Sequence, residues 1–115
     1  MPRVTKSVTA KKRHKKVLSK TKGHYGARSR LYKTAKQSGI KSLQYAFRDR
    51  KIKKRNFRSL WISRISAQAR IIGKSYSSII ANNAKNNILL NRKILSEIAI
   101  TEPDVFKKIV ETAES

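Results

Sequence analysis

Positive charge is concentrated in the first 72 residues of this 115-residue chain. That stretch contains 23 Lys or Arg residues but only one carboxylate, Asp49. An ordinary hydrophobic core cannot hold so many like charges, because they repel one another and a buried cation without a partner costs several kcal/mol. The stretch therefore predicts an extension that binds a polyanion, and only about 50 to 60 residues remain to share a core.

The chain lacks the residues that usually interrupt helices. There is no proline between Pro2 and Pro103, and the glycines lie only at positions 23, 26, 39 and 73. We therefore predict an all-α fold, with a long basic helical N-terminal extension (residues 1–58) followed by a small globular helical domain (residues 59–115).

Two helices are expected in the basic part. The first covers about residues 10–21 with Thr9 as its N-cap, and it ends where Gly23 and Gly26 permit a turn. The second begins near Ala27 and continues to Gly73, with position 39 as the one plausible bend.

Apolar residues recur at three- and four-residue steps in the last part of the chain, which predicts a core between helices. Ser75, Asn91 and Thr101 are predicted N-caps of three short helices, and the Asn-rich segment 82–87 predicts a turn. The predicted core residues are Phe57, Leu60, Trp61, Ile65, Ile94, Leu95, Ile98, Phe106 and Ile109.

Nothing in the sequence indicates an enzyme. It has no Cys, no phosphate-binding glycine loop and no nucleophile-elbow motif. We expect no cofactor, no bound metal and no small-molecule substrate. No apolar stretch approaches the roughly 18 residues that cross a bilayer, so no membrane partner is expected.

The run Arg48–Arg58 is the strongest local signal, because its cations can neutralise phosphates and release counterions. A solvated charged face is the alternative reading. Tyr25, Tyr32, Tyr45 and Phe47 either stack on unpaired RNA bases or pack against a neighbouring helix. The predicted RNA-binding residues are Arg3, Lys6, Lys11, Lys12, Arg13, His14, Lys15, Lys16, Lys22, His24, Tyr25, Arg28, Arg30, Tyr32, Lys33, Arg48, Arg50, Lys51, Lys53, Lys54, Arg55, Arg58 and Arg64.

Four segments resemble one known family. They are YGARSR at 25–30, RDRKIKKRNFRSLWISRI at 48–65, SYS at 75–77 and LNRKIL at 90–95. Together they resemble the bacterial-type large-subunit ribosomal protein L-twenty family, and the likeness covers nearly the whole chain.

The resemblance implies a partner, a role and a location. The extension would be threaded into 23S-type ribosomal RNA beside neighbouring large-subunit proteins and would promote early subunit assembly. Some relatives also repress their own mRNA through the C-terminal domain. The location would be the cytoplasmic ribosome of a bacterium or the ribosome of a plastid or mitochondrion. A DNA-compacting protein and a membrane-active cationic peptide are the rival readings of the charge.

Overall fold

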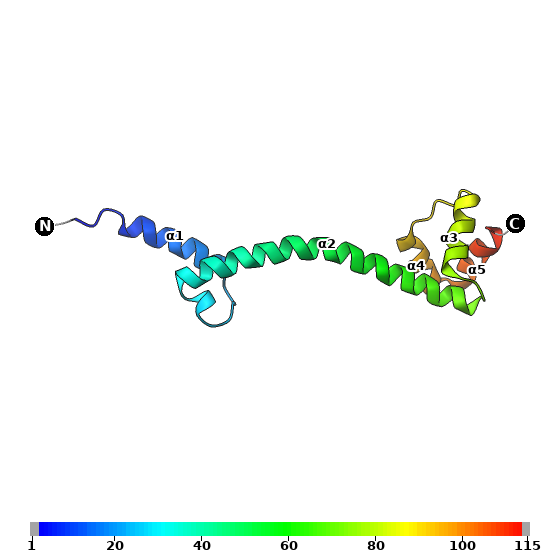
Figure 1. The fold of residues 1–115 in the computed structure, drawn as a ribbon, viewed down its shortest axis with the longest axis horizontal. Helices are drawn as coiled ribbons and strands as arrows, with labels where there is room; N and C mark the ends of the chain where they lie inside the picture. Colours follow the sequence, from blue (N-terminus) through cyan, green and yellow to red (C-terminus); the bar gives the residue numbers. More distant parts are fainter. Residues whose placement is uncertain (1–2, 114–115) are drawn as a thin grey trace. The chain divides into compact units, whose positions relative to one another are not determined.

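The computed structural model describes residues 3–113, and within them it contains helices and no strand. This confirms the all-α prediction and the long helix followed by shorter ones. In chain order the elements are α1 (Ser7–Lys20), the 3₁₀ helix η1 (Gly26–Ser29), α2 (Tyr32–Ile71), α3 (Tyr76–Lys85), α4 (Arg92–Thr101) and α5 (Pro103–Thr112) (Figure 1).

The chain divides into two compact units, Met1–Lys51 and Ile52–Ser115, which we call the N-terminal unit and the C-terminal unit. The 40-residue helix α2 contributes residues to both units. The boundary at residue 58 concerns which part of the chain folds on its own, and it stays a prediction.

Helix α1 begins earlier than the sequence suggested. Its first residue is Ser7, and Lys6 occupies the N-cap position without a side-chain hydrogen bond. The prediction that Thr9 caps a helix starting at residue 10 is therefore wrong. The backbone N–H of Ala10 donates to the carbonyl of Lys6 at 3.0 Å, so the helical ladder already includes Thr9.

The long helix begins later than the predicted Ala27. Gly26 has φ 62°, a left-handed conformation that glycine adopts at little cost, and it starts the 3₁₀ turn that precedes α2. The carbonyl of Ala27 accepts hydrogen bonds from the backbone N–H of Leu31 at 2.8 Å and from Thr34 Oγ1 at 2.9 Å. Because this carbonyl closes the turn and ties it to α2, the α-helix itself starts at Tyr32.

The N-terminal unit has a small contact between its two helices. Thr21, at the C-cap of α1, and Ala35 of α2 are both fully buried. Gly39 lies beside Thr21, and a Cβ atom at that position would stand 3.4 Å from the Thr21 Cγ2 atom. Helix α2 continues through Gly39 without interruption, so this glycine allows the two helices to approach closely.

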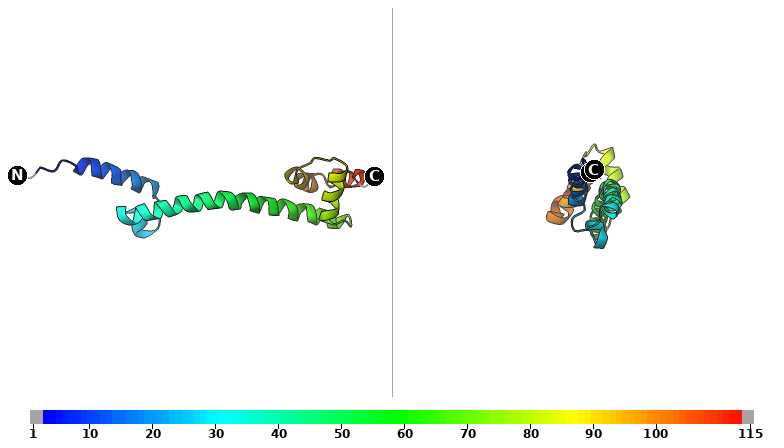
Figure 2. Two further views of the ribbon diagram at one scale, coloured as in Figure 1. Left: turned by 45° about the horizontal axis from the view of Figure 1, so that its top comes forward. Right: turned by 90° about the vertical axis from the view of Figure 1, so that its left-hand side faces the viewer.

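The C-terminal unit holds the hydrophobic core. Helix α5 packs against both α3 and α4, and these three helices gather around the last turns of α2 (Figure 2). Burial of this apolar surface is the main favourable term for such a fold. The buried cluster consists of Ile65, Ala69, Ile79, Leu95, Ala99, Phe106 and Val110.

Part of the expected core lies at the surface instead. Phe57 is 45% exposed, and Leu60 and Ile94 are each 42% exposed. Helices α3, α4 and α5 have only 10 residues each, and the apolar stripe of α2 becomes fully buried only at Ile65. Trp61, one turn earlier, is half-buried.

The other predicted core positions lie inside or against the cluster. Ile65, Leu95 and Phe106 have at most 1% of their surface exposed. Ile98 and Ile109 are partly buried and pack against these residues. Helices α2, α4 and α5 therefore supply these side chains, and α3 adds Ile79 to the same apolar cluster.

Two predicted caps are confirmed by hydrogen bonds. Ser75 Oγ accepts from the backbone N–H of Ser78 at 3.1 Å, and Asn91 Oδ1 accepts from that of Ile94 at 2.9 Å. Each cap satisfies an N–H group that has no partner within its own helix.

The third cap is wrong. Thr101 is the last residue of α4, where its Oγ1 donates to the carbonyl of Glu97 at 3.0 Å. Glu102 takes the cap position of α5 without a side-chain hydrogen bond, and Pro103 is the first residue of that helix. Proline fits there because its missing N–H would have had no helical partner.

The Asn-rich segment 82–87 ends α3, as predicted. The helix stops at Lys85, and Asn87 adopts a left-handed conformation with φ 54°. Asparagine tolerates this conformation better than most residues, because its short polar side chain can bond locally. Asn83 is only 4% exposed, and its carbonyl accepts from the backbone N–H of Ile88 at 2.8 Å.

Candidate nucleic-acid interface

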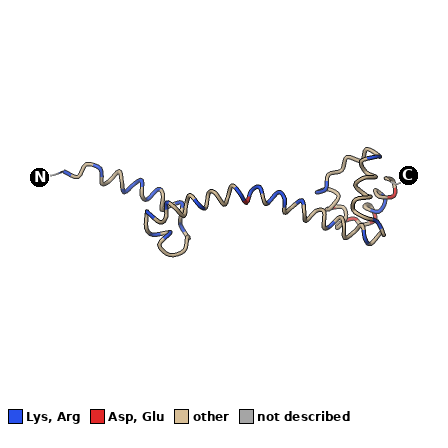
Figure 3. The backbone as a smooth tube through the Cα atoms, viewed as in Figure 1, with Lys and Arg blue, Asp and Glu red and all other residues tan. Residues whose placement is uncertain are grey.

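Lys and Arg residues follow one another along α1, the connection after it and α2 (Figure 3). The one carboxylate among the first 72 residues, Asp49, has its Oδ1 atom 2.9 Å from both Nε and Nη2 of Arg48. Within residues 3–113, no other cation of the predicted RNA-binding set has an ion pair. The positive charge of this stretch is therefore not balanced by the protein.

The predicted RNA-binding residues are spread over consecutive elements. Arg3 and Lys6 precede α1, six residues lie on it, five lie in the connection that includes η1, and the others lie on α2. Every Lys and Arg of the set is exposed to solvent, and only His24 and Tyr32 are partly buried. The set is accessible to a ligand, but the structure does not gather it into one pocket.

On α2 the cations surround the helix instead of forming one stripe. Successive residues of an α-helix step around its axis by about 100°. Lys51 and Lys53 therefore point to nearly opposite sides of the helix, and Arg50 points between them. Lys54 lies one turn from Arg50 on the same face, and Arg55 lies one turn from Lys51 on the same face. A ligand that occupies only one side of the helix would leave several of these charges without a counter-charge.

Two of the four predicted stacking residues, Tyr45 and Phe47, already have cations beside their rings. The Cζ atom of Arg48 lies 4.7 Å from the centroid of the Tyr45 ring, and the Nζ atom of Lys41 lies 5.1 Å from it. Lys51 Nζ lies 4.6 Å from the centroid of Phe47. These contacts fall within the range of cation–π attraction and hold positive charge beside flat apolar surface.

The other two predicted stacking residues differ from each other. The Tyr32 ring stacks on His14 with a centroid separation of 3.9 Å and an angle of 22° between the planes, so it packs against the neighbouring helix. Tyr25 is 94% exposed, which leaves its whole ring accessible to a base. Packing against a neighbouring helix is thus observed for Tyr32, whereas base stacking by Tyr25 stays a prediction.

Both histidines contact side chains of α2 within the N-terminal unit. His24 Nδ1 and Ser38 Oγ lie 2.7 Å apart in a hydrogen bond that fixes the connection against α2. His14 contributes its ring to the contact with Tyr32. Among the described residues there is no group of three or more His, Cys, Asp or Glu side chains that could hold a metal ion.

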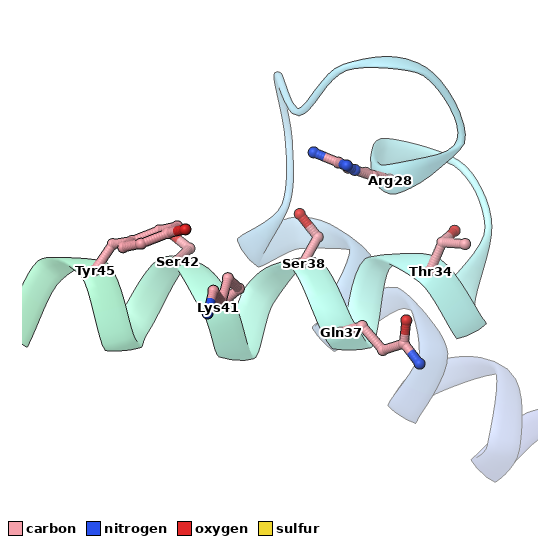
Figure 4. A pocket seen from close by; sticks show the side chains of 7 residues that line it. All are labelled: Arg28, Thr34, Gln37, Ser38, Lys41, Ser42 and Tyr45. Carbon is pink, nitrogen blue, oxygen red and sulfur yellow. The ribbon is translucent and has the colours of Figure 1, made fainter.

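A hollow of about 830 Å³ opens between the connection and the first turns of α2. The Arg28 side chain extends over the helix toward Ser38, while Ser42 and Tyr45 continue the row along the same helix (Figure 4). The residues that line this hollow, called the Arg28 pocket below, are Arg28, Thr34, Gln37, Ser38, Lys41, Ser42 and Tyr45.

A second hollow of about 350 Å³ lies in the C-terminal unit. Trp61 and Arg64 line it from α2, and Lys93 and Glu97 line it from α4. Its mixed charges distinguish it from the Arg28 pocket, which is lined by cations and neutral residues only.

Sequence reasoning named Arg28 and Tyr45 but missed the small polar residues between them. Thr34, Ser38 and Ser42 recur every four residues, which places them on one face of a helix. That spacing was the available signal. The turn that brings Arg28 over this face depends on contacts distant in sequence, such as the one between His24 and Ser38.

Comparisons with known proteins agree over the whole length. Residues 3–109 match the family described as "Ribosomal protein L20". "Large ribosomal subunit protein bL20" of Legionella pneumophila (strain Corby) is 56% identical over all of this chain and 97% of its own length. The protein of the same name from Cellvibrio japonicus is 51% identical over the same shares, and that from Francisella tularensis subsp. novicida is 56% identical, with 98% of its length covered.

None of the helices in residues 3–113 is both long and apolar enough to cross a membrane. The exposed cations, the presence of only one carboxylate among the first 72 residues and the full-length similarity lead to one conclusion. The chain belongs to the ribosomal protein L20 family, and it is a structural protein of the large ribosomal subunit that serves translation and is not an enzyme.

Proposed function

We propose that the chain binds 23S-type ribosomal RNA directly and promotes early assembly of the large subunit by neutralising phosphates where several RNA segments converge. The observation that carries this proposal is the distribution of exposed cations around α2, opposed by one carboxylate that is already paired with Arg48. RNA phosphates would supply the missing counter-charge, and the released counterions would drive binding.

The arrangement around the helix favours folded RNA over a duplex groove. A helix that lies in one groove needs cations mainly on the side that faces the phosphates. Arg50, Lys51 and Lys53 point in different directions, so full neutralisation requires phosphates on several sides. Converging RNA segments provide such a surrounding, and the protein would hold them together against their mutual repulsion.

The proposed partners and location follow from the relatives. Neighbouring large-subunit proteins are the expected protein partners, and the similar proteins come from bacteria. We place this chain in the cytoplasmic ribosome of a bacterium. Purification of ribosomes from the source cells, followed by mass spectrometry of the large subunit and its crosslinks, tests both statements.

The binding experiment uses the full chain and a transcript of bacterial 23S-type RNA, with duplex DNA as competitor. We expect log K to fall with log salt at a slope of about −0.7 to −0.9 per neutralised phosphate, and RNA to be preferred. Preference for duplex DNA would support the DNA-compacting alternative. Affinity that hardly changes with salt would contradict the electrostatic mechanism.

Assembly is tested separately from binding. Depletion of the protein in growing cells should lead to incomplete large subunits that contain 23S-type RNA, and re-expression should restore them. Replacement by a variant with Arg50, Lys51 and Lys53 changed to Gln should fail to restore them, although the hydrophobic core of the C-terminal unit is unchanged. Normal subunits in depleted cells would contradict the assembly role.

Repression of its own mRNA is the remaining part of the proposal, and it rests on the family resemblance. The C-terminal unit would carry this activity, and Arg64 and Lys93 beside Trp61 are its candidate RNA contacts. A reporter fused to the leader of the chain's own mRNA should lose expression when the protein is supplied in excess. Unchanged expression would exclude the repressor role without affecting ribosomal RNA binding.

A further inference from the structure

The Arg28 pocket has a shape that the chain fixes by local contacts. Thr34 Oγ1 donates a hydrogen bond to the carbonyl of Ala27, and the side chains of His24 and Ser38 are hydrogen-bonded to each other. The connection between α1 and α2 is therefore attached to α2 at two points. Gly26, with φ 62°, makes the turn between these ties. As a result, in the folded N-terminal unit Arg28 lies above α2 and the hollow between them is open to a ligand.

The groups in the pocket match a ligand that is both anionic and flat. Arg28 and Lys41 bring two cations, and neither has an ion pair within residues 3–113. Ser42 makes no hydrogen bond to any described residue, so its hydroxyl is available. The Tyr45 ring is 46% exposed and offers an apolar face at one end of the pocket.

We propose that the Arg28 pocket holds one unpaired nucleotide of RNA. Its phosphate lies between Arg28 and Lys41, its base stacks on the Tyr45 ring, and Ser42 donates to or accepts from the sugar or the base edge. The inference rests on the proposed binding of ribosomal RNA and adds to it a defined site for a single extruded nucleotide.

The size of the pocket supports a whole nucleotide over a phosphate alone. A hollow of about 830 Å³ is within the range of about 300 to 1,000 Å³ that accommodates small organic ligands. A backbone phosphate would occupy only the part next to the cations. Bases of single-stranded loops and bulges can be splayed out onto aromatic side chains, whereas bases inside a duplex cannot.

Lys41 and Arg48 lie over the Tyr45 ring in the structure, where the base would stack. The Lys41 contact is the longer of the two, at 5.1 Å, and its ammonium is on a flexible stem. On binding, Lys41 turns from the ring to the phosphate, and the base takes its place. Arg48 keeps its contact, because Asp49 also holds its guanidinium.

The first test is photo-crosslinking of the full chain to a 23S-type RNA transcript in which 4-thiouridine or 6-thioguanosine replaces part of the uridine or guanosine. Mass spectrometry identifies the joined residue and nucleotide. We expect Tyr45 to be joined to a nucleotide that is unpaired in the folded RNA. Absence of Tyr45 among the crosslinked residues, or a crosslink to a nucleotide inside a continuous duplex, would overturn the proposal.

The second test compares matched aromatic variants. Tyr45→Leu should weaken binding by about 5- to 150-fold, which corresponds to one base–aromatic stack. Tyr45→Phe should stay within about twofold of wild type, because its ring still stacks. Phe57→Leu is the control, because this ring is also exposed and also lies beside a lysine but lies outside the pocket. Equal losses for Tyr45→Leu and Phe57→Leu would refute the site.

A double-mutant cycle separates the site from general RNA binding. The crosslinked nucleotide is made abasic, and the loss of affinity is measured for wild type and for Tyr45→Leu. We expect the abasic RNA to weaken wild type but to weaken Tyr45→Leu no further, because one contact is removed in both cases. Additive losses would refute the pocket while leaving RNA binding intact, whereas wild type that does not bind the transcript would refute the proposed function itself.

Discussion

The imidazole ring of His14 lies flat on the phenol ring of Tyr32, with the ring centroids 3.9 Å apart. This contact joins α1 to the first residue of α2 across 18 positions of the chain. Together with the close approach of Gly39 to Thr21 and the hydrogen bond between His24 and Ser38, it gives the basic N-terminal unit a small packed corner. Apolar burial there is slight, because Thr21 and Ala35 are its only buried residues within the described part of the unit.

We expect this corner to be weakly populated without RNA. The N-terminal unit has a large unbalanced positive charge, and helices without tertiary support are marginal in water. Hydrogen exchange on the free full chain should show little protection over residues 30–55 and clear protection over residues 92–110, and RNA should protect both. Strong protection over residues 30–55 in the free protein would show that the extension is preformed and that RNA does not order it.

The core of the C-terminal unit should depend on Phe106 and not on Phe57. Phe106 is fully buried, so Phe106→Ala should lower the free energy of unfolding by about 3–5 kcal/mol. Phe57→Ala is the control, because a ring that is 45% exposed should lose less than about 1 kcal/mol. Urea unfolding of the full chain, followed by circular dichroism, measures both values, and similar losses would contradict the placement of the core.

Removal of the cap at the start of α4 should have a smaller effect than a core truncation. Asn91→Ala deletes the acceptor for the Ile94 N–H, and we expect a loss of about 0.5–2 kcal/mol. Asn91→Ser should restore most of it, because a serine hydroxyl can accept the same bond. The same unfolding measurement applies, and an unchanged stability of Asn91→Ala would mean that α4 does not need this bond.

Gly39 should tolerate alanine but not a large side chain. A methyl group there would stand 3.4 Å from the Thr21 Cγ2 atom, which is ordinary contact, and alanine favours a helix over glycine by about 1 kcal/mol. Gly39→Ala should therefore leave RNA affinity unchanged, whereas Gly39→Leu should push α1 away and weaken binding. Protection of α1 in hydrogen exchange of the RNA complex gives a direct readout. Equal affinities for the two variants would show that the close approach is unimportant.

Removal of a single phosphate-binding cation should reduce the salt dependence of RNA binding. Arg55→Ala should weaken RNA binding and reduce the slope of log K against log salt by about 1, without a change in stability. Lys107→Ala is the charge-matched control, because Lys107 lies 3.9 Å from Glu111 in the C-terminal unit. If both variants reduced the slope equally, net charge and not the position along α2 would govern binding.

The sequence by itself determined the all-α fold and the caps at Ser75 and Asn91, and it predicts a polyanionic partner. A cap depends on residues close in sequence, because its side chain bonds a backbone N–H group three residues away. The net charge is a sum over the residues of the chain and does not depend on how the chain folds. The family resemblance was likewise a property of residue order. The sequence was misleading at Thr101, which is compatible both with the last turn of α4 and with the N-cap position of α5. In the structure it is the last residue of α4.

Only the tertiary structure decided which apolar and polar residues meet. The surface of Phe57 stays exposed because the short helices α3 to α5 cover only the end of the stripe, and helical periodicity cannot reveal where that cover stops. Gly39 faces Thr21, and Arg28 lies above Ser38 and Tyr45, because a turn at Gly26 folds the connection back onto α2. Such contacts join residues far apart in sequence, so they depend on the path of the chain in space and not on any local pattern.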